Sequence, residues 1–568
     1  MALDWIKTSA RPSIVNTSDI ARCQGTEGPK GSTKMQTLVT DELVYLRPDT
    51  MLEPLVDRWY AWSYLIPPVT AARNITHRHL QIIDSYLSAP HVHAAAVKNP
   101  KMLGGPFIDY DGGRLEEIRS LKQKTLQNCG GLIRLSSAVQ ELGDLLRSEA
   151  KGGSLHPLYP RIPEPLRGFV ELVYDLNSQA SFRLIEPLLY RSAFYMRSLQ
   201  SLLLSTTSSD DRPFTLSTPR LDKDDAVHME IPFEDVVVDF LAELKSRPVR
   251  LADVRDALPL DTRDIERFDA FLTRIAPPQY SSYTGRGARW RYFGHACILL
   301  ETGSASFLFD PVISYSYQTS LHRYTYSDLP AVLDCVCITH NHQDHILMET
   351  LLQLRHRAKY IVVPKSAGSL EDPSLALILR AIGFRNVIEL GEMEELQIGD
   401  IKLIGVPFFG EHADLNIRSK LAYLVHVGRH SLMFAADSCN IEPKVYEHVQ
   451  KSVGHVDALF LGMECDGAPL SWLYGPLLTQ QIDRMSDQSR RLSGSNYDQG
   501  IDIVRRFGCS EVYVYAMGQE PWLNYIMSIK YTDASNPIIQ SNKLIEDCIA
   551  HGVRAERLFG EKEIFLDS

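Results

Sequence analysis

The sequence predicts an α/β protein in two parts: a mainly helical (α+β) N-terminal domain over residues 1–284 and a layered α/β domain over residues 285–568. Three observations support this prediction. Apolar residues recur at helical spacing in the first part, and short strand-like segments alternate with helices in the second. Between the two parts, residues 277–289 are rich in Pro, Gly, Tyr and Ser, as expected of a linker or the entry to a strand.

Helical periodicity is clearest in four segments of the N-terminal part. Apolar residues three and four positions apart predict helices over 115–127, 137–150, 166–179 and 192–204. The connections are rich in Pro and Gly, for example at 156–165. The aromatic segment Trp59–Tyr64 is interpreted as part of a helical core rather than as a platform for a substrate.

Strand-like segments dominate from residue 290 onward. They are dense in β-branched and aromatic residues and occur at 290–302, 305–311, 333–340, 359–364, 386–390, 420–438, 456–463 and 511–517. The segment 420–438 contains a predicted hairpin turn around Val427–His430. Helices are expected at 498–508 and 543–552. Strands alternating with helices predict a layered α/β domain.

The composition argues against several classes of protein. The 59 basic and 70 acidic residues give a net charge of −11 with no basic run, which disfavours a nucleic-acid partner. None of the nine cysteines is paired at CxxC spacing, so neither a zinc ribbon nor a disulfide framework is expected. Asp4 and Lys7 interrupt the stretch that a signal peptide requires, and no segment is apolar enough to span a membrane. We therefore expect a cytoplasmic protein without a membrane partner.

The segment ITHNHQDHI (338–346) carries the strongest functional signal. It places His340, His342, Asp344 and His345 between an apolar strand and a helix. Alternation directs the side chains of residues 340, 342 and 344 to one side of the extended segment, and His345 turns the other way. Three imidazoles and a carboxylate at a strand exit are able to bind two metal ions.

This HxHxDH pattern resembles the motif of the metallo-β-lactamase superfamily. Three further segments are similar to early and late strands of that superfamily: GHACILLE (294–301), FLFDP (307–311) and FAADS (434–438), the last ending at Asp437. The resemblance covers about residues 285–568 and implies an αββα sandwich for this part of the chain. Fold alone does not select the chemistry.

The ligand pattern departs from that of the hydrolases in this superfamily. Where they place a third histidine on the first metal, this chain has Glu411 and His412 side by side. Where they place a late histidine on the second metal, residues 513–522 contain none. Exchange of imidazoles for carboxylates favours iron or manganese over zinc.

A narrower resemblance agrees with this departure. GEHADL (410–415), an Asp 26 residues beyond Glu411, and GMECDGAPLSWLYGPL (462–477) are similar to the diiron β-hydroxylases that act with nonribosomal peptide synthetases in antibiotic biosynthesis. The resemblance implies a non-haem monooxygenase with two iron ions, O2 and an external electron donor. It also implies an amino acid substrate tethered as a thioester to the phosphopantetheine arm of a carrier domain, and a homodimer. The N-terminal domain would serve dimerisation and carrier-protein docking.

The same resemblance assigns the site residues. One iron would be held by His340, His342 and Glu411, the other by Asp344 and His345, with Asp437 as the bridge. Glu411 and Glu464 are the carboxylates expected to take part in catalysis, with Glu464 either beside the cluster or moving in as a ligand. The remaining ligand of the second iron is left open between water, Glu464 and Glu520.

Alternatives remain for several of these residues. His412 is a possible ligand in place of Glu411, and Asp437 and Glu464 could each have a purely structural role at a strand end. His295 and Asp310 are interpreted as residues that hold loops or ligands in place. Cys439 and Cys465 are interpreted as small buried side chains rather than nucleophiles.

Two other functions compete with the monooxygenase. The first is a dinuclear zinc hydrolase of a thioester, lactone or phosphoester, which the absent late histidine disfavours. The second is a carrier-binding module with a degenerate metal site, which the intact set of ligand types disfavours.

Overall fold

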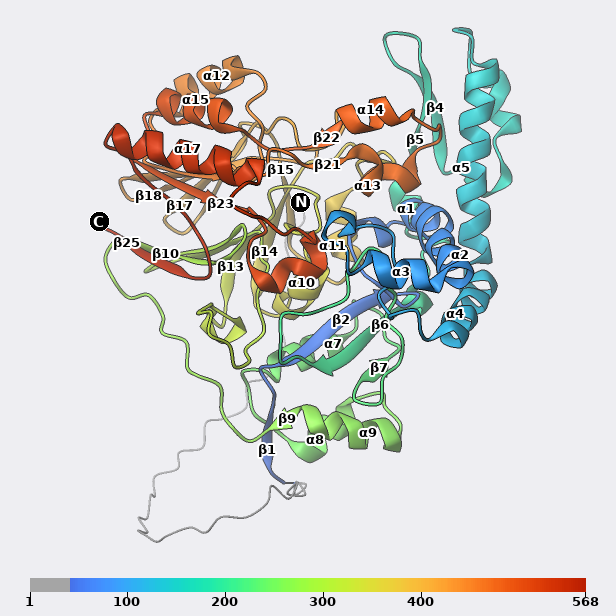
Figure 1. Cartoon of the computed structure of the whole chain (residues 1–568), viewed down its shortest axis with the longest axis horizontal. Helices are drawn as coiled ribbons and strands as arrows, with labels where there is room; N and C mark the ends of the chain where they lie inside the picture. Colours follow the sequence, from blue (N-terminus) through green and yellow to red (C-terminus); the bar gives the residue numbers. More distant parts are fainter. Residues whose placement is uncertain (1–40, 568) are drawn as a thin grey trace, which may run out of the picture.

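The computed structural model describes residues 41–567 (Figure 1). Cys23 and the N-terminal segment on which the expectation about a signal peptide depends lie outside these residues. Within 41–567, no helix is both long enough and apolar enough to cross a membrane.

Two seven-stranded sheets form the C-terminal part. The first has the order β15-β14-β13-β12-β11-β10-β25 and the second the order β16-β17-β18-β19-β20-β23-β24. The first sheet comprises β10 (Ala288–Gly294), β11 (Cys297–Thr302), β12 (Ser306–Phe309), β13 (Leu333–Cys337), β14 (Ala358–Pro364), β15 (Val387–Leu390) and β25 (Lys562–Leu566). The second comprises β16 (Glu395–Ile398), β17 (Ile401–Val406), β18 (Ala422–Val427), β19 (His430–Phe434), β20 (Ala458–Gly462), β23 (Glu511–Tyr515) and β24 (Arg554–Arg557). Val427 pairs with His430, which confirms the predicted hairpin.

Aromatic side chains fill the space between the two sheets. Phe309 of the first sheet stacks on Phe434 of the second with ring centroids 4.2 Å apart, and Phe434 stacks on Phe460 at 4.8 Å. Trp290 meets Phe460 edge-on at 5.1 Å. The alternating side chains of both sheets therefore form one buried layer, as in a sandwich.

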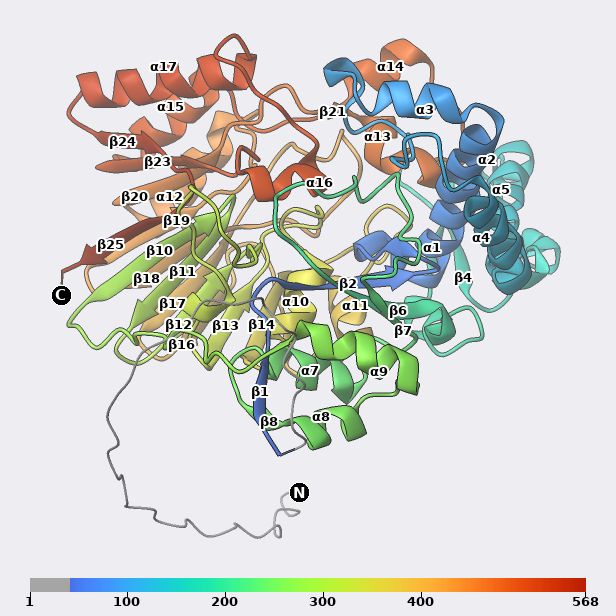
Figure 2. The same cartoon turned by 60° about the horizontal axis from the view of Figure 1, so that its bottom comes forward.

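Helices cover the two outer faces. The first sheet is covered by α10 (Met348–Leu354) and α11 (Leu375–Ala381), and the second by α12 (Pro443–Val453), α15 (Tyr497–Phe507) and α17 (Asn536–Ala550). Figure 2 shows α15 and α17 on the side of the sandwich away from the N-terminal helices. The helices predicted at 498–508 and 543–552 and the αββα sandwich are confirmed. The smaller elements of this part are α13 (Leu470–Tyr474), α14 (Arg484–Ser489), α16 (Asn524–Met527), β21 (Ala468–Pro469) and β22 (Arg491–Leu492).

The N-terminal part is α+β. Its helices are α1 (Pro68–Asn74), α2 (Leu80–Ser88), α3 (Pro90–Ala96), α4 (Leu115–Asn128), α5 (Gly130–Glu149), α6 (Glu186–Leu189), α7 (Val236–Glu243), α8 (Leu251–Ala257) and α9 (Thr262–Phe268). Its strands are β1 (Leu43–Leu46), β2 (Thr50–Val56), β3 (Trp59–Tyr60), β4 (Val170–Tyr174), β5 (Ala180–Leu184), β6 (Gln200–Thr206), β7 (Val227–Met229), β8 (Val249–Arg250) and β9 (Leu272–Thr273). They pair as β8-β1-β9, β3-β2-β6-β7 and β4-β5.

Two of the four N-terminal helix predictions are wrong. Residues 115–127 and 137–150 lie in α4 and α5 as predicted, whereas 166–179 contains β4 and 192–204 ends in β6. In β4 burial begins with the period of two that a strand requires, and β6 is paired on both edges by β2 and β7. A continuous apolar run in such an inner strand has no periodicity that separates it from a helix.

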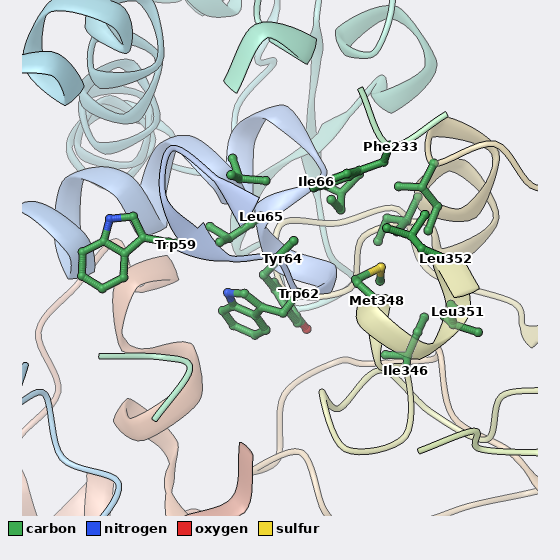
Figure 3. Close-up of a cluster of buried hydrophobic side chains, with 14 of the residues drawn as sticks. Trp59, Trp62, Tyr64, Leu65, Ile66, Phe233, Ile346, Met348, Leu351 and Leu352 are labelled. Carbon is green, nitrogen blue, oxygen red and sulfur yellow. The ribbon is translucent and has the colours of Figure 1, made fainter. Parts of the chain in front are cut away.

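The two parts share one hydrophobic core. Figure 3 shows Trp62 and Tyr64 beside Met348 of α10, whereas Trp59, a member of the same core, lies farther away and stacks on His79. The segment Trp59–Tyr64 is buried, but it lies on β3 and a short 3-10 turn (Ser63–Leu65) rather than on the helix expected from the sequence. The core of the N-terminal part thus continues into the helical layer of the sandwich.

A buried ionic cluster lies at the same junction. Arg212 Nη2 donates to Glu53 Oε1 and to Glu349 Oε2 of α10, both at 2.8 Å, and Arg220 Nε donates to Glu53 Oε1 at 3.0 Å. Tyr315 OH donates to Glu349 Oε1 at 2.6 Å. Charges buried this deeply are stable only while each keeps its partners.

Replacement of Glu349 should therefore destabilise the whole chain. We expect Glu349→Ala to lower the free energy of unfolding by about 3 kcal/mol or more, because Arg212 loses one of two buried carboxylate partners. Asp253→Ala removes a solvent-exposed ion pair with Arg250 and serves as the control, with an expected loss below about 1 kcal/mol. Equal denaturant midpoints for the two variants would contradict the role of the cluster.

Candidate metal centre

The six predicted metal ligands come from three segments that meet at one end of the two sheets. The segment carrying His340, His342, Asp344 and His345 follows β13. Glu411 lies in the loop between β17 and β18, and Asp437 follows β19. Side chains at strand exits on one edge of a layered fold converge, because these strands end at similar heights.

One ligand group consists of His340, His342 and Glu411. Their ligand atoms all lie within 4.8 Å of one another. His342 Nδ1 is 2.7 Å from Glu411 Oε2, and His340 Nε2 is 3.9 Å from the same oxygen. These three atoms surround a space suited to one metal ion.

A second group consists of His340, His345 and Asp437, again with ligand atoms within 4.8 Å. His345 Nε2 is 2.9 Å from Asp437 Oδ2 and 3.5 Å from Asp344 Oδ2. Asp437 Oδ2 also lies 3.8 Å from His340 Nε2 in the first group. Asp437 is therefore placed between two potential metal positions.

Each histidine is held by its outer nitrogen. Thr339 Oγ1 is 3.0 Å from His340 Nδ1, Tyr474 OH is 3.0 Å from His342 Nε2, and Asp310 Oδ2 is 2.8 Å from His345 Nδ1. Such contacts fix the ring orientation and leave the inner nitrogen for a metal.

His295 positions Asp344. Its Nδ1 accepts a hydrogen bond from the backbone N–H of Gly518 at 3.3 Å, so the ring proton of the neutral tautomer resides on Nε2. Nε2 in turn is 2.9 Å from Asp344 Oδ2 and donates to it. His295 also forms a potential ligand group with Asp344 and His345, in which only its Nε2 faces the carboxylate.

The backbone around the centre is strained. His295, Asp310, Glu411 and Ala436 adopt left-handed φ angles of 54°, 37°, 67° and 46°. Each of these conformations costs of order 1 kcal/mol or more for a residue with a side chain and is typical of functional sites. Gly462 contributes by its small size, because a Cβ atom there would approach Asp437 Oδ1 to 2.3 Å.

The donor set fits a pair of cations. His340 Nε2 and Asp437 Oδ1 are buried and have no hydrogen-bond partner within the described residues, an arrangement that is costly unless an ion satisfies them. Burial opposes protonation of His345, but Asp437, Asp344 and Asp310 raise its pKa well above the usual value. Burial raises the pKa of Glu411 to about 7, against the influence of His342.

The geometry favours Glu411 over its neighbour His412 as a ligand. His412 Nδ1 lies 2.8 Å from Tyr474 OH, and its ring packs beside His342 with centroids 4.3 Å apart. His412 belongs to none of the potential ligand groups formed by the described residues.

Two other carboxylates singled out in the sequence are engaged elsewhere. Glu464 Oε1 accepts from the N–H of Gly467 at 2.8 Å, and Oε2 accepts from Tyr531 OH. Glu520 accepts from Tyr292 OH.

Cys439 and Cys465 are thiols whose pKa values burial raises to about 11 and about 12, so neither is an activated nucleophile.

Tyr474 was not identified by sequence reasoning. Its hydroxyl bridges His342 and His412, and its own pKa is raised well above the usual value, chiefly by burial. It lies within the segment 462–477, but no spacing distinguishes it from the other aromatic residues there.

Removal of Glu411 should weaken metal binding. We expect Glu411→Ala loaded with ferrous iron to retain about one metal ion per chain or fewer, against about two in the wild type, because one position loses its only unshared carboxylate. His412→Gln is the matched control and should keep the wild-type content, as measured by elemental analysis. The reverse pattern would make His412 the ligand.

The chain matches two family descriptions. Residues 45–276 match the diiron non-heme beta-hydroxylase N-terminal domain, and residues 306–468 match the beta-lactamase superfamily domain. These matches confirm the resemblance noted in the sequence.

Individual relatives extend over nearly the whole chain. The 3-hydroxylase of 4-amino-L-phenylalanyl-CmlP-peptidyl-carrier-protein from Streptomyces venezuelae is 40% identical over 523 residues, covering 90% of this chain and 98% of the relative. The crystal structure of CmlA, a diiron β-hydroxylase from Streptomyces venezuelae, has a TM-score of 0.87 and 39% identity, covering 93% and 100% of the two chains. A variant of CmlA gives a TM-score of 0.85 and 39% identity, covering 92% and 100%. The chain belongs to the diiron non-haem β-hydroxylases.

Proposed function

We propose that this enzyme is an oxygen-dependent monooxygenase that hydroxylates the β-carbon of an amino acid held as a thioester on a carrier domain of a nonribosomal peptide synthetase. The observation that carries the proposal is the oxygen-rich ligand set, in which Glu411 occupies the place of a histidine. The end-to-end similarity to a hydroxylase of a carrier-bound amino acid supports the same reaction.

The ligand assignment is part of this proposal. His340, His342 and Glu411 would hold one iron, Asp344 and His345 would hold the other, and Asp437 would lie between them as a shared ligand. Glu464 and Glu520 already accept hydrogen bonds from tyrosines, which favours water among the three candidates for the remaining ligand of the second iron.

The bound irons supply the reduction of O2 and the oxidising power for the C–H bond. The protein supplies orientation and access. Asp344, with 13% of its side chain exposed, is slightly more open than the histidines of the centre. Burial raises the pKa of Glu464, against the hydrogen bonds that its two oxygens accept from Tyr531 and Gly467.

The two domains divide these tasks. We assign carrier docking and dimerisation to residues 1–284 and the metal chemistry to residues 285–568, and we expect an electron-transfer partner because the reaction consumes two external electrons. The eight cysteines among the described residues are free thiols, which supports a cytoplasmic location.

The decisive experiment supplies the iron-loaded protein with a reductant, isotopically labelled O2 and a series of aminoacyl carrier domains. We expect one labelled oxygen atom in the aminoacyl group and little product from the free amino acid. Two zinc ions per chain together with thioester hydrolysis would instead establish the hydrolase. Equal rates on free and tethered amino acids would contradict carrier docking.

A further inference from the structure

A large cleft separates the two domains on one side of the molecule. It has a volume of about 920 Å³ and is lined by residues of the α1–α2 region, the loop 104–107, the segment 214–217 and the segment 469–481. We call it the interdomain cleft. Its walls combine aromatic rings, such as Phe214 and Trp472, with uncharged amide side chains, such as Gln81 and Gln480.

The interdomain cleft lies one layer of residues away from the metal motif. Phe214 and Trp472 of its wall stack with centroids 6.3 Å apart. The residue after Phe214, Thr215, donates its hydroxyl to Gln343 Oε1 at 3.3 Å, and Gln343 lies between two predicted ligands. Two residues beyond Trp472, Tyr474 contacts His342. On both inner walls of the cleft, a residue close in sequence to a lining residue therefore contacts the metal motif: Thr215 contacts Gln343, and Tyr474 contacts His342.

The cleft also has an unbalanced positive charge. Its lining includes Arg73 and Arg78 but no Asp or Glu, although acidic residues outnumber basic ones in the chain. These arginines are only 2% and 7% exposed and form no ion pair with any described residue; burial lowers the pKa of each to about 10, so both stay charged at neutral pH. Buried cations without carboxylate partners favour an anion nearby.

The hydrogen bonds of the two arginines connect this charge to the inner wall. Arg73 donates to the carbonyls of Pro476 and Leu478 at 3.0 and 2.7 Å, and Arg78 donates to that of Trp472 at 2.8 Å. Arg78 Nη1 has no partner among the described residues. The arginines thus fix the segment that contacts the metal motif and retain their full charge.

We propose that the interdomain cleft binds the phosphopantetheine arm of the carrier domain, with the arm's phosphate attracted by Arg73 and Arg78 and its amides facing the glutamine-lined wall. This inference rests on the proposed function. The aminoacyl end then reaches the metal centre past Phe214, which is half-buried, whereas the Trp472 indole is tied by its Nε1–H to the carbonyl of Gly104 at 2.9 Å.

The test uses the arm without its carrier. In titration calorimetry, 4′-phosphopantetheine should bind about tenfold more tightly than pantetheine, which lacks the phosphate. Inorganic phosphate, which cannot fill the cleft, should bind more weakly than both. Gln81→Glu and Gln480→Glu, both at exposed positions, should each weaken phosphopantetheine binding about threefold to tenfold. Gln127→Glu makes the same charge change on α4 outside the cleft and should have no effect.

A second measurement locates the thiol end. Phe214→Cys should form a mixed disulfide with phosphopantetheine disulfide about tenfold faster than Gln127→Cys, detected by intact mass. Equal trapping rates, equal affinity for pantetheine, or inorganic phosphate binding as tightly as the arm would each overturn the assignment. Hydroxylation of a loaded carrier by wild-type protein is scored separately. If the carrier-bound amino acid is hydroxylated but the arm does not bind the cleft, only the assignment of the cleft is wrong. If the arm binds but no hydroxylation occurs, only the proposed reaction is wrong.

Discussion

Buried negative charge at the edge of two sheets is the constraint on which the rest of the structure depends. Asp344, Glu411 and Asp437 converge with three imidazoles in a space largely closed to water. Carboxylates in such a place repel one another, and only cations or protons relieve the repulsion. The surrounding contacts hold the ligand side chains in place despite this repulsion. Hydrogen bonds fix the outer ring nitrogens of the histidines, and left-handed φ angles, which residues with side chains rarely adopt, direct the side chains inward.

The N-terminal domain contributes to this arrangement from a distance. Helix α10 begins three residues after His345, and its Glu349 is held by Arg212 and Tyr315. The metal motif therefore lies between a strand of the sandwich and a helix that the N-terminal half anchors. On the other side of the motif, Tyr474 belongs to the segment fixed by Arg73 and Arg78. The N-terminal half thus contacts the elements on both sides of the metal motif.

The sequence was sufficient for the metal motif and for most strands of the catalytic half because these features are local; β25, which pairs with β10 from the other end of the domain, was not predicted. A motif of six residues, strands flanked by turns, and capped helices such as α15, with its Asn496 capping box, are all visible in short windows. The N-terminal half depends on distant pairing instead. Its strand β6 is fixed by β2, about 150 residues earlier, and no window that contains one strand reveals the other.

The same distinction separates the ligands from their supports. His340 and Asp437 carry chemistry that can be recognised by residue type and position. Tyr474 and Arg78 support the site through contacts with residues that are distant in sequence. Nothing in the neighbouring sequence distinguishes them from other tyrosines and arginines. Glu411 and His412 were adjacent candidates, and only the backbone conformation of the loop decided which one faces the histidines.

The shared core has a consequence for synthesis of the chain. Trp62 and Tyr64 pack against residues 346–352, so almost 300 further residues must leave the ribosome before these two side chains have their partner layer. During that interval the N-terminal half exposes a large apolar surface, a state prone to association with other nascent chains. Expression at low temperature or with chaperones that shield such surfaces should therefore raise the yield of folded enzyme, and the N-terminal half is a poor choice for isolation as a separate fragment.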